Sequence, residues 1–256
     1  MAGGSASRVR IGQVLVVATA LLGLEIGPRV IADPIAFVPL SEVFKSGLEA
    51  ISSGTLVSDF AATLGAYLVS GLLIVVLGVP LGVLLRRFPR IRRAVQPYMT
   101  IYYALPVFVF YPVLLALLGF NLWPIVVIAW LWGVVAVILN TAAGFDQVPD
   151  VLIKLGQSLN LSRRAALKSI YLPAAAPYIF TGIKIGISYA LIGVVAAEFV
   201  ISNRGLGYSI SYNYVNFGVD KMYVGIYSVF LLALVANLLF STIERRAYRH
   251  AYSQGK

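Results

Sequence analysis

Two ionisable side chains, Lys184 and Glu198, interrupt one long hydrophobic segment and are the first candidates for chemistry. An ionisable group inside such a segment is costly and usually faces a polar cavity or extends to the interface. Lys184 would line a pathway that favours an anionic solute, or would extend to the interface. Glu198 would belong to an outer gate, hold the following loop by hydrogen bonds, or lie solvated at the interface. The chain has no cysteine and one histidine, His250, so the residues predict no metal site and no thiol chemistry.

Two glycines and a row of aromatic residues follow the same hydrophobic segment. Gly205 and Gly207 predict a tight external turn, because glycine adopts backbone angles that other residues avoid. The aromatic residues after them suit a membrane interface and are Tyr208, Tyr212, Tyr214 and Phe217.

The composition places these groups in a membrane protein. Of 256 residues, 60% are hydrophobic and 12% are charged, whereas a soluble domain carries about a quarter charged residues. In a soluble protein the net charge of +10 would suggest nucleic acid. Here the basic residues follow the membrane topology, so we expect a lipid bilayer and no nucleic acid as partner.

Six segments are long and apolar enough to cross a bilayer, which takes about 20 residues. They cover residues 11–27, 60–85, 98–118, 122–140, 177–201 and 222–243. The sequence therefore predicts an all-α membrane protein with six transmembrane helices. Pro106 and Pro112 predict that the third is irregular and faces the protein interior.

The basic residues alternate between the connecting segments, and this predicts the orientation. Fifteen lie in one set of segments: Arg8, Arg10, Arg86, Arg87, Arg90, Arg92, Arg93, Lys154, Arg163, Arg164, Lys168, Arg245, Arg246, Arg249 and Lys256. The other set holds four: Arg29, Lys45, Arg204 and Lys221. Basic residues favour the cytoplasmic side, so we expect both termini on the cytoplasmic side of the membrane.

The first hydrophobic segment has two interpretations. It is short, with Glu25 near its outer end, so residues 1–32 are either a retained span or a signal peptide with Val30-Ile31-Ala32 as the cleavage site. Residues 28–57 would lie outside. They contain a predicted interfacial helix behind Ser41 as its N-cap.

A polar segment between the fourth and fifth spans, residues 140–173, has the pattern of two short helices joined by a turn. Pro149 suits the first turn of one helix, and Asn160 suits the left-handed residue that ends it. Ser162 is a good N-cap for a second helix, which Pro173 would close. The segment would either fold back on the membrane surface or present a basic surface to a partner.

This polar segment resembles the cytoplasmic signature of permease subunits of binding-protein-dependent ATP-binding cassette (ABC) importers. That signature reads Glu-Ala-Ala, three residues, Gly, nine residues, Ile-x-Leu-Pro. Ile170, Leu172 and Pro173 match its end. Asn160 takes the place of the glycine, and Lys154-Leu155-Gly156 takes the place of Glu-Ala-Ala, with the charge reversed at Lys154.

A second stretch strengthens the resemblance, which covers roughly residues 58–245. Ala197-Glu198-Phe199 and Gly205-Leu206-Gly207-Tyr208 are similar to a pattern of the nitrate, sulfonate and taurine branch. We therefore divide the chain into residues 1–57, a permease core at 58–245 with coupling helices at 149–172, and a cytoplasmic tail at 246–256.

The resemblance implies a type I importer permease. In such importers two permease copies, here expected as a homodimer, form a path that an external substrate-binding protein supplies. In each copy the helix pair at 149–172 docks on one of two ATP-binding subunits. The chain has no G-x-x-x-x-G-K-[ST] phosphate loop. We therefore expect that the chain itself is not an enzyme and binds no cofactor directly, and that the partner subunit uses ATP. The resemblance to this branch suggests a small anion or small organic compound as substrate and a bacterial inner membrane as the location.

Two other classes of function remain open. An ion-coupled secondary transporter needs coupling carboxylates near the bilayer midplane, whereas Glu25, Asp59 and Glu198 all lie towards the ends of spans. A non-transporting membrane scaffold would use the helix pair to recruit a partner.

Overall fold

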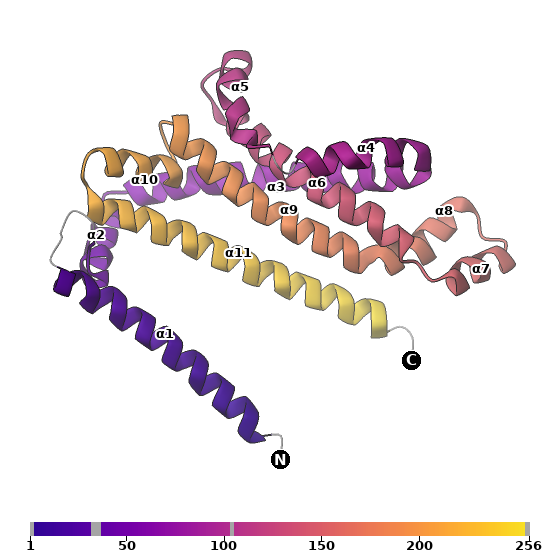
Figure 1. Cartoon of the computed structure of the whole chain (residues 1–256), viewed down its shortest axis with the longest axis horizontal. Coiled ribbons are helices and arrows are strands. Elements are labelled where there is room, and N and C mark those ends of the chain that lie inside the picture. The colour runs from indigo at the N-terminus through magenta and orange to yellow at the C-terminus, as the bar shows by residue number, and fades with distance from the viewer. Residues whose placement is uncertain (1–2, 32–36, 103–104, 254–256) are drawn as a thin grey trace.

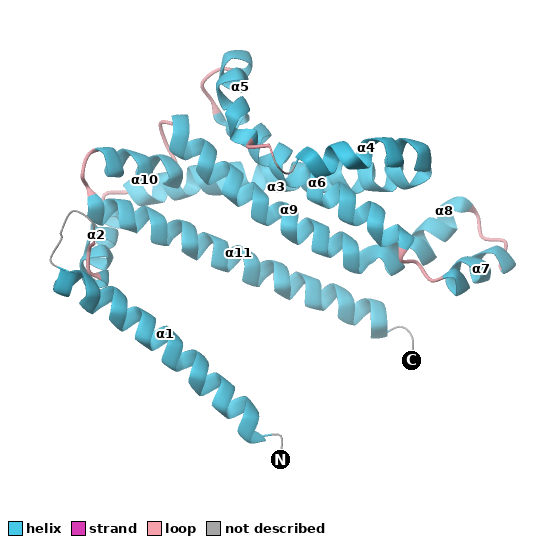
Figure 2. Ribbon diagram, in the orientation of Figure 1, coloured by secondary structure: helices cyan, strands magenta, loops and turns pink. Residues whose placement is uncertain are grey.

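All regular structure in the described residues is helical, as expected for an all-α protein (Figure 2). The computed structural model describes residues 3–31, 37–102 and 105–253. Ala32 of the possible cleavage site and the basic residue Lys256 lie outside them. The elements are α1 (Gly3–Ile31), α2 (Leu40–Ser52), α3 (Thr55–Arg87), α4 (Pro89–Tyr102), η1 (Val107–Phe110), α5 (Tyr111–Leu118), α6 (Leu122–Asp146), α7 (Asp150–Ser158), α8 (Arg163–Ala166), η2 (Leu167–Tyr171), α9 (Leu172–Ile201), α10 (Leu206–Val215) and α11 (Val219–Ser253).

Four helical stretches in the described residues are long and apolar enough to cross a membrane: α3, α6, α8 through α9, and α11. A fifth candidate is the expected third span, which is broken. Its halves, α4 and η1 with α5, meet at 89°, and two residues between them, 103–104, lie outside the described part. Pro106, which directly precedes η1, cannot donate a helical hydrogen bond. The helix α1 is not among these candidates, so the expected count of six spans is not reproduced.

The core of the bundle is α6, which packs between α3 and α9. Close approach depends on small residues, as is usual in membranes. A Cβ on Gly133 of α6 would overlap the backbone oxygen of Gly186 in α9. A Cβ on Gly82 of α3 would lie 2.5 Å from the Cβ of Thr141 in α6.

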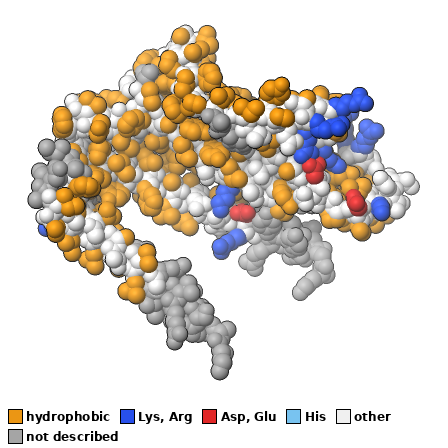
Figure 3. Space-filling view, viewed as in Figure 1, with side chains coloured by type: hydrophobic (Ala, Val, Ile, Leu, Met, Phe, Trp, Pro, Cys, Tyr) orange, Lys and Arg blue, Asp and Glu red, His pale blue; other side chains and the backbone are white. Residues whose placement is uncertain are grey.

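The two ends of the bundle carry different features (Figure 1). The helices α7 and α8 project from one end, where most of the visible Lys and Arg side chains gather (Figure 3). We call this the basic end. The helices α2 and α10 lie at the opposite end, which we call the α10 end.

The helix α2, which the sequence predicts to lie at the membrane interface, lies across the α10 end (Figure 1). Its Val43 is buried, whereas Phe44 and Leu48 are exposed. The expected N-cap is wrong, because α2 begins at Leu40 after Pro39. The amide and the hydroxyl of Ser41 instead donate to the Glu25 carboxylate of α1, at 3.0 and 2.9 Å.

Candidate functional site

The helix pair at the basic end consists of α7 and α8, joined by a tight turn. Asn160 has a φ of 49° and is the left-handed residue that the sequence predicts. Ser162 is the N-cap of α8 and accepts a hydrogen bond from the Ala165 amide at 3.3 Å. Both expectations are confirmed. Pro149 directly precedes α7 and does not lie in its first turn.

The second helix of the pair does not end at Pro173. The helix α8 continues through the π turn η2 into α9, whose first residues are Leu172 and Pro173. A proline cannot donate to the carbonyl four residues earlier, here Ser169, and its ring crowds that carbonyl. The wider turn directly upstream accommodates this. The helix pair is therefore a direct extension of the fifth span.

Gly156 and Ile170 hold the pair together. Gly156 is buried, and a Cβ on it would lie 2.6 Å from the Cδ1 of Ile170. The carbonyl of Gly156 also accepts a hydrogen bond from the Leu161 amide at 3.1 Å. The third position of Lys154-Leu155-Gly156 lies where α7 folds back on η2, so a larger residue there would displace the end of the Ile170 side chain.

An apolar stripe on α7 faces away from the bundle. Val151 and Leu155 lie on one face of α7 at four-residue spacing, and Leu159, which directly follows the last residue of the helix, continues this spacing. Their exposed fractions are 75%, 50% and 62%. Lys154, next to the stripe, is exposed as well. We call these three residues the α7 stripe.

At the α10 end, three side chains hold the loop between α9 and α10. Three consecutive amides of this loop donate hydrogen bonds: Gly205 to Asp59 at 3.0 Å, Leu206 to Thr63 at 2.8 Å and Gly207 to Glu198 at 3.0 Å. The Thr63 hydroxyl in turn donates to Glu198, 2.8 Å from Oε2. The first N–H groups of a helix have no helical partners, and here side chains of α3 and α9 supply them. We call Asp59, Thr63 and Glu198 the loop clasp.

The burial of Glu198 excludes one of its three expected roles. Only 1% of the residue is exposed, so it is no solvated interfacial charge. A buried carboxylate needs hydrogen-bond donors, and Thr63 and Gly207 provide them. Glu198 therefore holds the loop. Sequence reasoning missed that Asp59 and Thr63 also hold this loop, although their spacing of four residues places both on one face of α3.

Gly205 and Gly207 allow the loop to lie directly on the clasp. Gly205 has a φ of 105°, which favours glycine, and a Cβ there would overlap the Glu198 carboxylate. A Cβ on Gly207 would overlap the carbonyl oxygen of Val195. The tight turn expected from these glycines is confirmed.

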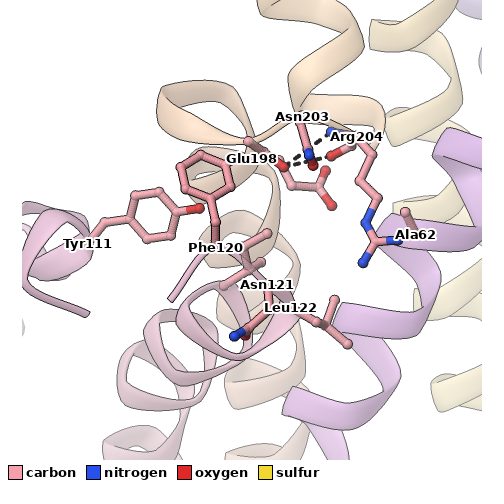
Figure 4. Close-up of a pocket in the computed structure, with 10 residues that line it drawn as sticks. Ala62, Tyr111, Phe120, Asn121, Leu122, Glu198, Asn203 and Arg204 are labelled. Carbon is pink, nitrogen blue, oxygen red and sulfur yellow. Dashed lines mark hydrogen bonds between the residues drawn. The ribbon is translucent and has the colours of Figure 1, made fainter. Parts of the chain in front are cut away.

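A cavity of about 180 Å³ opens beside the clasp (Figure 4). Glu198, Arg204, Asn121 and Tyr111 are among the residues that line it. In Figure 4 the Arg204 side chain extends from the loop towards Ala62 of α3. The cavity thus lies between the loop, α3 and the segment that leads from α5 into α6.

Lys184 lies elsewhere in the bundle. It is half-buried and lines a second cavity of about 210 Å³ with Tyr67, Ser188 and Asn237, among others. Along α9, Lys184 and Glu198 are about 21 Å apart, at about 1.5 Å per residue. The structure therefore does not bring them into one site. In the described residues no cluster of His, Cys, Asp or Glu could hold a metal ion.

Comparison with known proteins places these features in a family. Residues 74–249 match the family described as "Binding-protein-dependent transport system inner membrane component". The taurine transport system permease protein TauC of Escherichia coli is 27% identical over 201 residues, which cover 78% of this chain and 73% of TauC. The nitrate import permease protein NrtB of Leptolyngbya laminosa is 29% identical over 188 residues, 73% of this chain and 67% of NrtB.

The chain is also similar to a permease whose name refers to other solutes and to a solved structure. The glycine betaine/proline betaine transport system permease protein ProW of E. coli is 30% identical over 202 residues, 77% of this chain and 57% of ProW. The fold is similar to a chain of the MetNI methionine ABC transporter in an inward facing conformation. The TM-score is 0.62 at 20% identity, over 78% of this chain and 97% of that one. Because the family match covers more than half of the chain, from α3 to α11, the protein belongs to the inner membrane components of binding-protein-dependent transport systems, the permease subunits of ABC importers.

Proposed function

We propose that this permease moves a small solute inwards, driven by ATP hydrolysis on separate subunits that dock on α7 and α8. The observation that carries the proposal is the α7 stripe, which is exposed on a helix outside the bundle. An exposed apolar face with basic neighbours suits a protein groove. Of the other signature residues, Gly156, Asn160, Ser162 and Ile170 shape the pair, and Leu172 and Pro173 lead into α9.

The proposed assembly contains two copies of this chain, two ATP-binding subunits and an external substrate-binding protein. Both termini would face the cytoplasm, since the basic end carries α7, α8 and most of the visible cationic side chains. The cavity beside the clasp would then lie at the outer end of the path, with Glu198, Gly205 and Gly207 at an outer gate.

The proposed substrate is a small anion or a small organic compound. The names of two relatives refer to taurine and nitrate. Lys184 supports this choice, because it places a cation at a cavity in the middle of a spanning helix.

Docking is tested by co-purifying the chain from its native membrane in mild detergent and identifying its partners by mass spectrometry. We expect Leu155→Glu to lose an ATP-binding subunit that the wild type retains, because a charge would replace an apolar contact. Leu48→Glu on α2 is the matched control, since the exposed fractions of the two leucines are 50% and 52%. Wild-type protein that purifies without any ATPase, as a stable homo-oligomer, would contradict the proposal.

The ion-coupled alternative has less support, because the carboxylates it would use hold structural partners. Glu25 pairs with Arg29 and accepts bonds from Ser41. Asp59 and Glu198 hold the loop at α10. Partner binding without any uptake would favour the scaffold alternative instead.

A further inference from the structure

An arginine at the end of α3 is placed between the two ends of the helix pair. The guanidinium carbon of Arg86 lies 3.6 Å from the ring centroid of Tyr171 and 4.8 Å from that of Phe145. Phe145 is the penultimate residue of α6, and Tyr171 is the last residue of η2. The two rings therefore precede and follow the helix pair in the chain. A guanidinium group stacks favourably on aromatic faces.

A second arginine strengthens the same junction. Arg92 of α4 forms an ion pair with Asp146, the last residue of α6, with Nη2 2.7 Å from Oδ2. Phe145 beside it is 3% exposed. These contacts give Arg86 and Arg92 a structural role besides the membrane orientation that the distribution of basic residues predicts.

The helix that carries Arg86 near its C-terminal end carries two residues of the loop clasp near its N-terminal end. Asp59 and Thr63 lie in the first turns of α3, and Arg86 lies in its last turn. The helix is continuous over 33 residues, which corresponds to about 50 Å. It also packs tightly along α6, as at Gly82, and a packed interface transmits displacement rather than absorbing it.

We propose that Arg86 is a positioning residue that fastens the helix pair to α3, so that a displacement of α7 and α8 reaches the loop clasp. The contact with Tyr171 makes the residues that follow the helix pair move with the C-terminal end of α3. The contact with Phe145 does the same for the residues that precede the pair. The clasp then changes how the loop at residues 202–207 lies over its cavity. This inference rests on the proposed function, because it needs a partner that moves the pair.

The absence of cysteine from the sequence gives a clean reporter. In an Asn203→Cys parent, whose new thiol lies in the exposed loop, we measure labelling by a membrane-impermeant maleimide. The complex with its ATPase subunit is compared without nucleotide and with ATP and vanadate. We expect nucleotide to change the labelling rate in the parent. Adding Arg86→Ala abolishes this difference, while the ATPase subunit still co-purifies and hydrolyses ATP.

Matched variants separate the contact from general damage. Arg87→Ala, at the exposed neighbour, retains the nucleotide response, and Arg86→Lys restores part of it because a cation still faces the rings. Tyr171→Phe keeps the response, whereas Tyr171→Leu loses it. If Arg86→Ala does not fold, the two Tyr171 variants test the same contact.

Each other outcome has a definite meaning. A nucleotide response that survives in Arg86→Ala or Tyr171→Leu overturns the role of Arg86. A parent that binds and hydrolyses ATP without any change in labelling overturns the connection to the clasp. A loss of ATPase co-purification in Arg86→Ala overturns it as well, since Arg86 would then serve docking. Only a parent that retains no ATPase subunit counts against the proposed function itself.

Discussion

At the scale of single residues, Gly205 combines two constraints. Its φ of 105° favours glycine, and a Cβ there would overlap the Glu198 carboxylate. Gly54 has a similar φ of 77° but open space around it. Comparing the same substitution at Gly205 and Gly54 therefore distinguishes the cost of backbone strain from the cost of close packing.

We predict that Gly205→Ala destabilises the protein more than Gly54→Ala. Strain at a positive φ costs about 1–2 kcal/mol at either position, and the overlap with Glu198 adds about 1–3 kcal/mol at Gly205 alone. Thermal unfolding in detergent, followed by circular dichroism, measures the two shifts. Equal shifts would mean that the loop does not lie on the clasp.

Lys184 allows a prediction about transport. We expect Lys184→Met to reduce uptake of an anionic substrate by about tenfold to a hundredfold, because losing a charge-assisted hydrogen bond costs roughly 1.5–3 kcal/mol. Uptake is compared at matched membrane levels, with Lys221→Met near the start of α11 as the control. Normal uptake by Lys184→Met would identify Lys184 as a side chain that only extends to the interface.

At the scale of elements, α6 is the helix against which α3 and α9 are placed. Its contacts rely on backbones that approach closely, as at Gly133 against Gly186. Gly65 of α3, by contrast, has nothing within 4 Å of where its Cβ would lie. Glycine in a helix interior otherwise costs about 1 kcal/mol relative to alanine.

Alanine should therefore be destabilising at Gly133 but not at Gly65. Gly133→Ala is expected to lower the free energy of unfolding by about 1–3 kcal/mol, since the added methyl group pushes α9 away. Gly65→Ala should be neutral or stabilising by up to about 1 kcal/mol. Unfolding of both variants in the same detergent decides this, and a stabilising Gly133→Ala would contradict the α6–α9 packing.

At the scale of the whole molecule, the two ends of the bundle must face opposite sides of the membrane. Gln157 on α7 and Asn203 in the clasped loop are both exposed and lie at opposite ends. We predict that an impermeant maleimide labels Asn203→Cys in intact spheroplasts and labels Gln157→Cys only after lysis. The reverse pattern would overturn the proposed cytoplasmic placement of the termini and of α7.

Much of this protein was predictable from local sequence patterns. The apolar segments indicate a helical membrane protein, because burying the backbone in lipid requires helices of a certain length. The turn at Asn160 and the N-cap at Ser162 were predictable because each depends on neighbouring residues only. The position of the α2 N-cap was not, since Ser41 bonds to Glu25 of another helix.

The tertiary structure decided what the polar residues do. The sequence by itself determined the membrane class and the existence of the helix pair, through periodicity and local turn chemistry. Only the packing of α3, α6 and α9 brings Thr63 to Glu198 and places Arg86 between Phe145 and Tyr171. These partners are separated by long stretches of chain, so no local pattern encodes them. Their contacts exist because small residues let three helices approach closely enough for their ends to meet.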